Sequence, residues 1–231
     1  MNAKLMEIFR SIQGEGPYAG LPQVFVRFFE CNIHCSWCDT PASIGDTSRN
    51  YKEVSADDLF AQVKALYEGC HSVSITGGEP LLQTAFLIEF LPMLRNAGMK
   101  VYLETNGILP KELLSVIDVV DIVAMDIKLP SSTGEKAFWH EHEEFLRIAL
   151  TKDVFIKAVV SKETADDDVY TAVEMVKRID PNILFILQPN SFDLRDSNAC
   201  INKCLEFQQY CSKILTDVRI TPQMHKFMKL R

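Results

Sequence analysis

Short apolar runs alternate along this chain with longer stretches in which apolar residues recur at helical spacing. The apolar runs are rich in β-branched and aromatic residues, which favour extended strands. Six of them are candidate strands, over residues 24–30, 72–76, 101–105, 122–128, 154–160 and 184–188. Several are apolar almost without interruption, which is typical of strands covered on both faces of a parallel sheet. The pattern therefore predicts six buried, parallel strands.

Helical segments lie between these strands. Ser55 and Thr164 are of the types that cap helix N-termini, and Gly98 suits a helix C-terminus. The predicted helices cover residues 55–69, 84–98, 135–150, 164–179 and 197–214. Alternating strands and helices give right-handed crossovers and a parallel sheet. Because six strands are too few to close an eight-stranded barrel, we expect an α/β fold, a partial, open (β/α)6-type TIM-like barrel.

Composition is that of one globular domain. The chain has 231 residues, 47% of them hydrophobic, and no repeat or linker divides it. The net charge of -7 argues against nucleic acid as a direct partner, because an acidic surface repels phosphates. Residues 1–9 lack the apolar run of a signal peptide, and no segment is apolar for long enough to span a bilayer. We therefore expect a cytoplasmic protein without a membrane partner.

Polar and glycine residues gather where the predicted strands stop. These strand ends lead into residues 30–31, 76–79, 104–106, 126–128 and 188–190. In parallel α/β folds, ligands bind at the carboxyl ends of the strands. The sequence therefore places its candidate chemistry at one end of the predicted barrel.

Three of the seven cysteines lie within eight residues, in a C-x3-C-x2-C pattern formed by Cys31, Cys35 and Cys38. Without a secretory signal, cysteines are mostly reduced thiols or metal ligands. Three thiolates on one short loop suit three irons of a 4Fe-4S cluster and leave the fourth iron open for a small molecule. Zinc with His34 as fourth ligand is an alternative, and inert core thiols are another. The close spacing on a polar loop favours the cluster.

The pattern with Trp37 before its last cysteine resembles the C-x3-C-x-aromatic-C motif of the radical S-adenosylmethionine (SAM) superfamily. Gly77, Gly78 and Glu79, followed by proline, resemble that superfamily's Gly-Gly-Glu-Pro segment. The resemblance implies that Trp37 contacts adenine and that the glycine segment holds the methionine amino group. It also implies an iron–sulfur cluster that cleaves SAM to a 5′-deoxyadenosyl radical.

Further strand ends resemble cofactor-binding positions of that superfamily, although each one alone is more often structural. Glu104 and Asn106 would contact ribose and adenine edges. Asp126, Lys128 and Ser131 would bind the ribose hydroxyls and the carboxylate. The expected SAM-binding set is completed by Asp39, Gln188, Pro189 and Asn190.

Four features together resemble the 7-carboxy-7-deazaguanine synthase family. They are residues 11–16 (SIQGEG), Arg27, Asp39-Thr40 and residues 221–225 (TPQMH). The resemblance implies a carbon–nitrogen lyase of queuosine and deazapurine biosynthesis, formed by one radical SAM core domain over residues 1–231. Its substrate would be 6-carboxy-5,6,7,8-tetrahydropterin, which loses ammonia after hydrogen abstraction from C6. It further implies Mg²⁺, a homodimer, and a one-electron reductant such as flavodoxin or ferredoxin.

The resemblance also assigns substrate-binding residues in the N-terminal part of the chain. Ile12, Gln13 and Gly14 would contact the pterin. The Glu15 carboxylate would accept hydrogen bonds from the 2-amino group and a ring N–H. Arg27 would hold the substrate carboxylate in a bidentate pair, although an arginine in a strand is also compatible with a surface position or a salt bridge.

Four further residues complete the expected site. Thr76 would contact the substrate, and Gln223 and His225 would lie near the mouth of the site. Thr40 would bind Mg²⁺, an ion that prefers hard oxygen ligands, although a threonine before proline also suits a plain turn. No residue stands out as a catalytic acid or base.

Other residues that often carry chemistry are expected to be structural. Cys200, Cys204 and Cys211 share one face of a predicted helix, where core packing is favoured over an auxiliary cluster. His140 and His142 are expected at a surface or interface.

Two functions compete with the main interpretation. They are a glycyl-radical activase that acts on a protein partner, and a zinc-binding module without activity.

Overall fold

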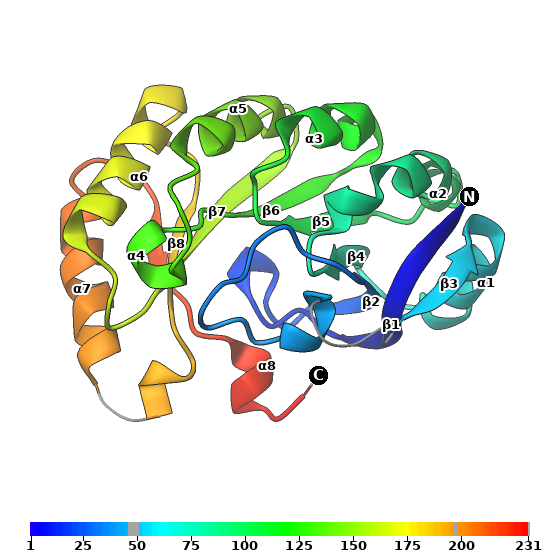
Figure 1. The fold of residues 1–231 in the computed structure, drawn as a ribbon, viewed down its shortest axis with the longest axis horizontal. Coiled ribbons are helices and arrows are strands. Elements are labelled where there is room, and N and C mark those ends of the chain that lie inside the picture. The colour runs from blue at the N-terminus through cyan, green and yellow to red at the C-terminus, as the bar shows by residue number, and fades with distance from the viewer. Residues whose placement is uncertain (46–50, 196–197, 231) are drawn as a thin grey trace.

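A nine-stranded sheet forms the centre of the molecule in the computed structural model, which describes residues 1–45, 51–195 and 198–230. The strand order is β3-β1-β2-β4-β5-β6-β7-β8-β9. Strands β3 and β9 end the sheet at opposite edges, so the barrel stays open. Figure 1 shows the main helices in an arc around the outer face of the sheet, with the short α8 near the open side. The expected partial TIM-like barrel is confirmed in this form.

All six predicted strands are present, with ends that move by at most two residues. They are β2 (Pro22–Phe28), β4 (Ser72–Gly77), β5 (Val101–Thr105), β6 (Ile122–Asp126), β7 (Asp153–Val160) and β8 (Phe185–Pro189). Each pairs in parallel with the next in this order. Their carboxyl ends therefore meet at one edge of the sheet, as the sequence predicts.

Three strands were not predicted: β1 (Asn2–Ile12), β3 (Lys52–Ser55) and β9 (Val218–Ile220). β1 pairs antiparallel with both β2 and β3, so the sheet is mixed and not purely parallel. β9 continues the parallel part of the sheet beside β8. β1 is half-exposed along most of its length and β9 has three residues, so neither has the buried apolar run by which the other strands were found.

The longer helices are α1 (Ala56–Leu66), α2 (Thr84–Asn96), α3 (Pro110–Val116), α5 (Trp139–Ala149), α6 (Asp166–Ile179) and α7 (Ala199–Cys211). Ser55 caps α1, since its Oγ accepts from Asp58 N at 3.2 Å. Gly98 has φ +73° just after α2, as expected of a helix C-terminus. The predicted start of the last helix at Ser197 lies outside the described residues.

Thr164 does not cap α6, contrary to expectation. The helix begins at Asp166 after Ala165, and the Thr164 hydroxyl instead accepts from Ser161 N at 2.8 Å. α3 was not predicted, and two one-turn helices were also missed, α4 (Pro130–Thr133) and α8 (Met224–Phe227). These short helices matter for function, because α4 follows β6 directly and α8 lies beside the N-terminal loop.

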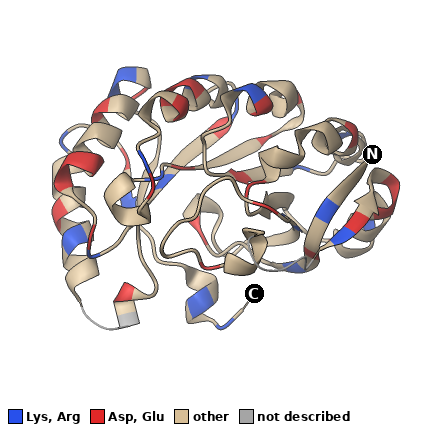
Figure 2. Cartoon of the chain, in the orientation of Figure 1, with Lys and Arg blue, Asp and Glu red and all other residues tan. Residues whose placement is uncertain are grey.

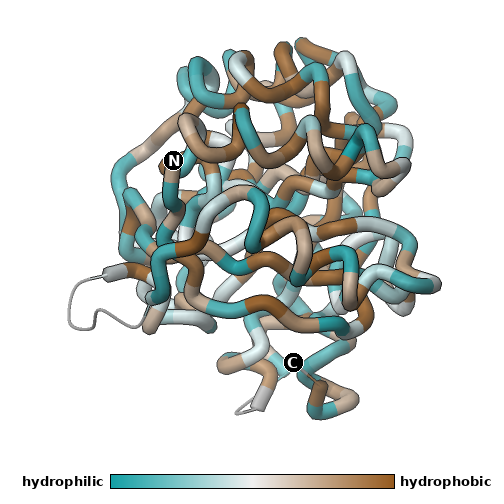
Figure 3. The backbone as a smooth tube through the Cα atoms, turned by 90° about the vertical axis from the view of Figure 1, so that its right-hand side faces the viewer, coloured by the Kyte–Doolittle hydropathy of each residue, from teal (hydrophilic) through white to brown (hydrophobic). Residues whose placement is uncertain are grey.

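One hydrophobic core joins the sheet to its helical layer. It contains residues from Ala3 in β1 to Leu215 after α7. Figure 3 shows apolar and polar stretches alternating along the helices, and Figure 2 shows charges of both signs on the outer helices. There Glu143 of α5 pairs with Arg147 and with Arg178 of α6. Within the described residues, no helix combines the length and apolarity needed to cross a membrane.

Candidate active site

A cavity opens at the carboxyl ends of the parallel strands. It is lined by strand ends, by the loop after β1, by the cysteine loop after β2 and by the segment before α8. Every site residue expected from the sequence lines this cavity except Glu79 and Ser131. Residues that are more than 200 positions apart in the chain, such as Gln13 and Gln223, therefore share one site.

The cysteine loop packs directly against the glycine pair after β4. A Cβ on Gly78 would lie 2.2 Å from the Glu30 carbonyl oxygen, so only glycine allows this approach. Glu79 N donates to the same carbonyl at 2.8 Å, and Glu30 itself has φ +81°. This packing holds the loop that carries Cys31 at the cavity wall.

Cys31, Cys35 and Cys38 are partly buried free thiols that line the cavity. Burial raises the pKa of the Cys31 thiol to about 11 and also raises those of Cys35 and Cys38, whereas nearby Lys128 acts in the opposite direction on all three. A bound metal centre supplies the stabilisation that three such thiolates need. Three thiols on one loop at a cavity wall fit three irons of a cluster.

Glu79 does not reach the cavity. Its side chain is fully buried and accepts from Leu81 N at 3.0 Å, Asn106 N at 2.8 Å and Thr105 Oγ1 at 3.0 Å. Burial raises the pKa of this carboxyl to about 7, against the effect of these hydrogen bonds. Glu79 therefore joins the loops after β4 and β5, and only Gly77 and Gly78 of the motif line the cavity.

The Glu104 carboxylate faces residues of the expected substrate site. It accepts from Gln13 Nε2 at 2.8 Å, Ser74 Oγ at 3.1 Å and Thr76 Oγ1 at 2.8 Å. Gln13 is buried and also donates to Gln23 at 3.0 Å. These bonds fix Gln13 and Thr76, and Glu104 itself also lines the cavity.

Asp126 keeps one carboxylate oxygen open in the buried part of the site. Its Oδ2 accepts from Lys128 Nζ at 2.9 Å, whereas its Oδ1 has no hydrogen-bond partner among the described residues. Burial alone would raise the pKa of Asp126, but Lys128 and Lys157 outweigh it and lower the pKa. The Gln188 Oε1 atom is likewise buried without a partner there. Asp126 Oδ1 and Gln188 Oε1 are therefore buried acceptors that could bind donors of a ligand, such as ribose hydroxyls or ring N–H groups.

Ser131 lies outside the cavity, contrary to expectation. It sits on α4, where its backbone N donates to Asp168 at 2.7 Å and its hydroxyl bonds to the same carboxylate. Ser131 Oγ also accepts from Ala165 N at 2.8 Å. Ser131 therefore joins α4 to the start of α6, beside a separate shallow pocket that it shares with Trp37 and Asn190.

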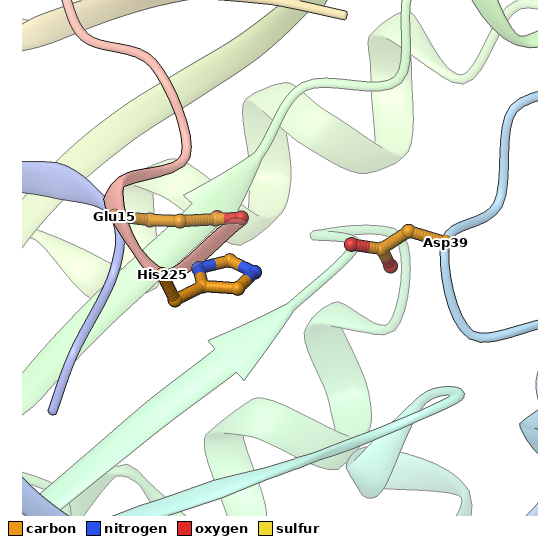
Figure 4. A group of neighbouring side chains, drawn as sticks. All are labelled: Glu15, Asp39 and His225. Carbon is orange, nitrogen blue, oxygen red and sulfur yellow. The ribbon is translucent and has the colours of Figure 1, made fainter. Parts of the chain in front are cut away.

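The C-terminal segment reaches the loop after β1. Gln223 Nε2 donates to Glu15 Oε1 at 2.6 Å and to Asp39 Oδ2 at 3.0 Å. Figure 4 shows Glu15 beside His225, with Asp39 pointing toward them from the cysteine loop. Ligand atoms of these three residues lie within 4.8 Å of one another. Asp39, which was expected to contact SAM, also pairs with Lys226 Nζ at 2.9 Å at this end of the cavity.

Two residues of the expected carboxylate and Mg²⁺ sites have protein partners. Arg27 lines the cavity, and its Nε donates to Glu7 Oε1 at 2.9 Å from the paired position on β1. Arg27 is thus both salt-bridged and available at the cavity. Thr40 Oγ1 donates to Asp39 Oδ1 at 3.2 Å, which places two hard oxygen ligands side by side.

His142 is buried, although the sequence analysis placed it at a surface or interface. It lies on the face of α5 that also buries Phe145 and Leu146, whereas His140 is exposed. His142 Nε2 lies 3.1 Å from the Asn106 carbonyl oxygen, and burial lowers the pKa of the imidazole to about 4. It supports the loop after β5 from behind.

Lys157 was missed by the sequence analysis. It projects from the middle of β7 into the cavity, hydrogen bonds to Glu15, and lies 3.4 Å from Asp126 Oδ2. The sequence feature that could have identified it is a single lysine within an otherwise apolar predicted strand. Glu7 and Gln23 were also missed, and both support site residues from the strands behind them.

The three cysteines of α7 are placed as expected. Cys200, Cys204 and Cys211 are buried on α7, and the last two belong to the main hydrophobic core. Cys200 Sγ contacts the Val160 carbonyl oxygen at 3.0 Å. Core packing is thus confirmed for this helix face.

Comparison with known proteins agrees with this arrangement. Residues 26–176 match the family model of the radical SAM superfamily. The chain is 43% identical to the 7-carboxy-7-deazaguanine synthase of Geobacter sulfurreducens, over 98% of this chain and 97% of the relative. It is 35% identical to the enzyme of that name from Thermoplasma acidophilum, over 97% and 96%.

A solved structure shares the fold. The crystal structure of QueE from Escherichia coli matches with a TM-score of 0.64 over 97% of this chain and 95% of that one, at 23% identity. The family itself is shown by the closer sequence relatives, which align over nearly their full length. This chain belongs to the 7-carboxy-7-deazaguanine synthase family of the radical SAM superfamily.

Proposed function

We propose that this chain is a radical SAM lyase that converts 6-carboxy-5,6,7,8-tetrahydropterin to 7-carboxy-7-deazaguanine with loss of ammonia. This reaction belongs to queuosine and deazapurine biosynthesis. The observation that carries the proposal is that the Glu15 loop, the cysteine loop and the C-terminal segment line one cavity. Relatives named for this activity align over nearly the whole chain, so the aligned region includes both the cysteine loop and the residues expected to bind the substrate.

The reaction uses a 4Fe-4S cluster, SAM and Mg²⁺. When bound, the cluster and SAM supply the radical that removes a hydrogen atom from C6 of the substrate. Cys31, Cys35 and Cys38 would hold three irons and leave one iron free for the methionine amino and carboxylate groups. Lys128 lies close enough to all three thiols to oppose part of the rise in pKa that burial causes, and so it favours their thiolate forms.

Residues around the cysteine loop would bind the rest of SAM. The backbone of Gly77 and Gly78 lines the cavity beside the cysteines and would meet the methionine end. The open Asp126 Oδ1 would accept from a ribose hydroxyl, and Lys128 keeps that carboxylate ionised. The residues expected to contact the adenine and ribose of SAM also include Trp37, Asn106, Gln188, Pro189 and Asn190, all of which line the cavity.

The substrate would bind between the loop after β1 and the C-terminal segment. Glu15 would accept from the 2-amino group and a ring N–H, a donor pair that a carboxylate matches with its two oxygens. Gln13 and Thr76 are held in place by Glu104, which pre-orders them for contact with the heterocycle. Arg27, oriented by Glu7, would pair with the substrate carboxylate. Ile12, Gly14 and His225 line the same end of the cavity.

Thr40 would bind Mg²⁺ together with the substrate carboxylate and water. Its hydroxyl lies next to the Asp39 carboxylate, and hard oxygens of this kind are what Mg²⁺ prefers. The ion would orient the substrate and polarise its carboxylate.

Other properties of the enzyme are inferred from its class. A radical SAM enzyme needs a one-electron donor, and we infer flavodoxin or ferredoxin in this role. We also infer a homodimer in the cytoplasm and a single core domain over residues 1–231. The continuous core from Ala3 to Leu215 supports the single domain. A glycyl-radical activase is not supported, because the relatives carry the name of a small-molecule synthase.

Anaerobic turnover tests this function. The reconstituted enzyme is mixed with reductant, Mg²⁺, SAM and 6-carboxy-5,6,7,8-tetrahydropterin, and products are followed by mass. We expect 7-carboxy-7-deazaguanine with only trace loss of SAM. If 5′-deoxyadenosine forms while the pterin is untouched, the superfamily stands and the proposed substrate is wrong.

A further inference from the structure

Lys157 lies between the two ends of the cavity. Its side chain is 15% exposed, and its ammonium group contacts the carboxylates of Glu15 and Asp126. Glu15 belongs to the expected substrate site and Asp126 to the expected SAM site. A buried lysine is retained only when anionic partners offset the loss of its hydration. Both carboxylates supply that compensation here.

The two contacts of Lys157 are unequal. Asp126 already accepts from Lys128 at 2.9 Å, whereas Lys157 is 3.4 Å from it. Glu15 accepts from two neutral amides, Gln223 at 2.6 Å and Gln188 at 3.3 Å, and Lys157 is the cation paired with it. Among the described residues, loss of Lys157 would leave Asp126 with Lys128 and would leave Glu15 with hydrogen bonds from the two amides.

The direction of the Glu15 carboxylate matters for binding, because only a carboxylate that faces two adjacent N–H donors can accept from both. The charge-assisted bond from Lys157 holds one oxygen of Glu15 from the β7 side. The other oxygen is held from the C-terminal side by Gln223. The carboxylate is therefore ordered before any ligand arrives, which reduces the entropic cost of binding.

We propose that Lys157 is a positioning residue for the substrate: it holds the Glu15 carboxylate in place for the 2-amino and ring N–H edge of the heterocycle. The proposal rests on the proposed function, because it takes Glu15 as the group that contacts the pterin. Lys157 acts through Glu15, and so its effect disappears when Glu15 no longer carries a charge.

Binding without turnover tests this role. The reconstituted enzyme with SAM and Mg²⁺ but no reductant is titrated anaerobically with 6-carboxy-5,6,7,8-tetrahydropterin in a calorimeter. We expect Lys157→Met to raise the Kd of the pterin at least about tenfold, the effect of losing a bond to a charged group. The Kd of SAM should change less than about threefold, because Asp126 keeps Lys128. Lys177→Met on the exposed face of α6 is the matched control.

A double-mutant cycle separates positioning from a general structural role. Glu15→Gln should raise the Kd of the pterin, and the Glu15→Gln/Lys157→Met double variant should bind no more weakly than Glu15→Gln alone. If Lys157→Met fails to fold alone, Lys157→Gln, which keeps a polar side chain in the cavity, replaces it in both arms of the cycle. An unchanged Kd in Lys157→Met, or a further rise in the double variant, overturns the proposal.

Failure of the proposal and failure of the proposed function give different results. If the unmodified enzyme neither binds nor converts the pterin, the proposed function is wrong. If it binds and converts the pterin while Lys157→Met does so equally well, the function stands and Lys157 has no positioning role.

Discussion

Gln223 and Glu15 are 208 positions apart in the chain, yet the Gln223 amide donates to the Glu15 carboxylate at 2.6 Å. The same amide donates to Asp39 at 3.0 Å. Met224 N also donates to the Gly14 carbonyl at 2.8 Å. The C-terminal segment thus joins the loop after β1 to the cysteine loop, and the proposed substrate end of the cavity is complete only when all three are in place.

Gln223→Ala should weaken substrate binding with little effect on the chemistry. Two hydrogen bonds to carboxylates are lost, each of which contributes about 1.5–3 kcal/mol when the partner is charged. We expect the KM of the pterin to rise by about tenfold or more while kcat changes little. Gln209→Ala on the exposed face of α7 is the control. Unchanged KM for Gln223→Ala would show that the bridge has no part in binding.

Arg27 depends on Glu7 for its orientation. Glu7→Gln keeps the size of the side chain but removes the charge that holds Arg27 Nε at 2.9 Å. We expect a rise of about threefold to tenfold in the KM of the pterin, smaller than the loss caused by Arg27→Lys, which removes the planar fork itself. Glu53→Gln on exposed β3 serves as the control. The assignment of Arg27 to the substrate carboxylate fails if Arg27→Lys keeps the parental kcat/KM.

The central strands could be predicted because burial on both faces imposes an apolar run, as in β4 with Val73 and Ile75. β1 has no such run, since much of it is half-exposed. The location of the site also followed from the sequence, because parallel strands bring their carboxyl ends together whatever the details of packing.

The partners of individual carboxylates could not be predicted. Glu79 follows β4, and Glu104 lies near the end of β5. Glu79 faces the loop after β5 whereas Glu104 faces Gln13, and this depends on side-chain direction in the folded sheet. Lys157 was missed because a single lysine in a strand is usually exposed. His142 was predicted at a surface or interface together with His140, but residues two apart on a helix point in different directions. His142 shares the buried face of α5 with Phe145 and Leu146, and this spacing was the sign that it is buried.

The three cysteines of the loop should be individually required for the cluster. Replacement of Cys31, Cys35 or Cys38 by alanine leaves two thiols, which cannot hold three irons. We expect loss of the brown colour and of the iron–sulfur absorbance at about 400 nm after anaerobic reconstitution. Cys200→Ala, at a buried position on α7, should retain both. An iron-free unmodified protein that binds zinc stoichiometrically would instead support a zinc site.

His142 should make stability fall as the pH falls. Its pKa is lowered by burial to about 4, below the value of about 6.5 in the unfolded chain, so the unfolded state binds more protons between these values. Its contribution is fully present above about pH 6.5 and is lost toward pH 4, with a slope of at most about 1.4 kcal/mol per pH unit.

Chemical denaturation of the unmodified protein and of His142→Gln between pH 4.5 and 7 measures this slope. Other groups, including Glu79, titrate in both proteins, so the difference between the two curves isolates His142. We expect the free energy of unfolding to fall more steeply with decreasing pH in the unmodified protein. Parallel curves would mean that His142 is not buried in its neutral form.

Gly14 should be intolerant of any side chain because His225 occupies the space. A Cβ at Gly14 would lie 2.0 Å from His225 Nδ1 and 2.7 Å from His225 Cβ, so α8 itself would have to move. We expect Gly14→Ala to raise the KM of the pterin more than His225→Gly does, because displacement of α8 also breaks the Gln223 bridge. In Gly14→Ala/His225→Gly the clash with the residue-225 side chain, its Cβ included, is gone, so its KM should return to that of His225→Gly. If the two single effects instead multiply in the double variant, Gly14 is needed for its own backbone and not for the approach of the C-terminal segment.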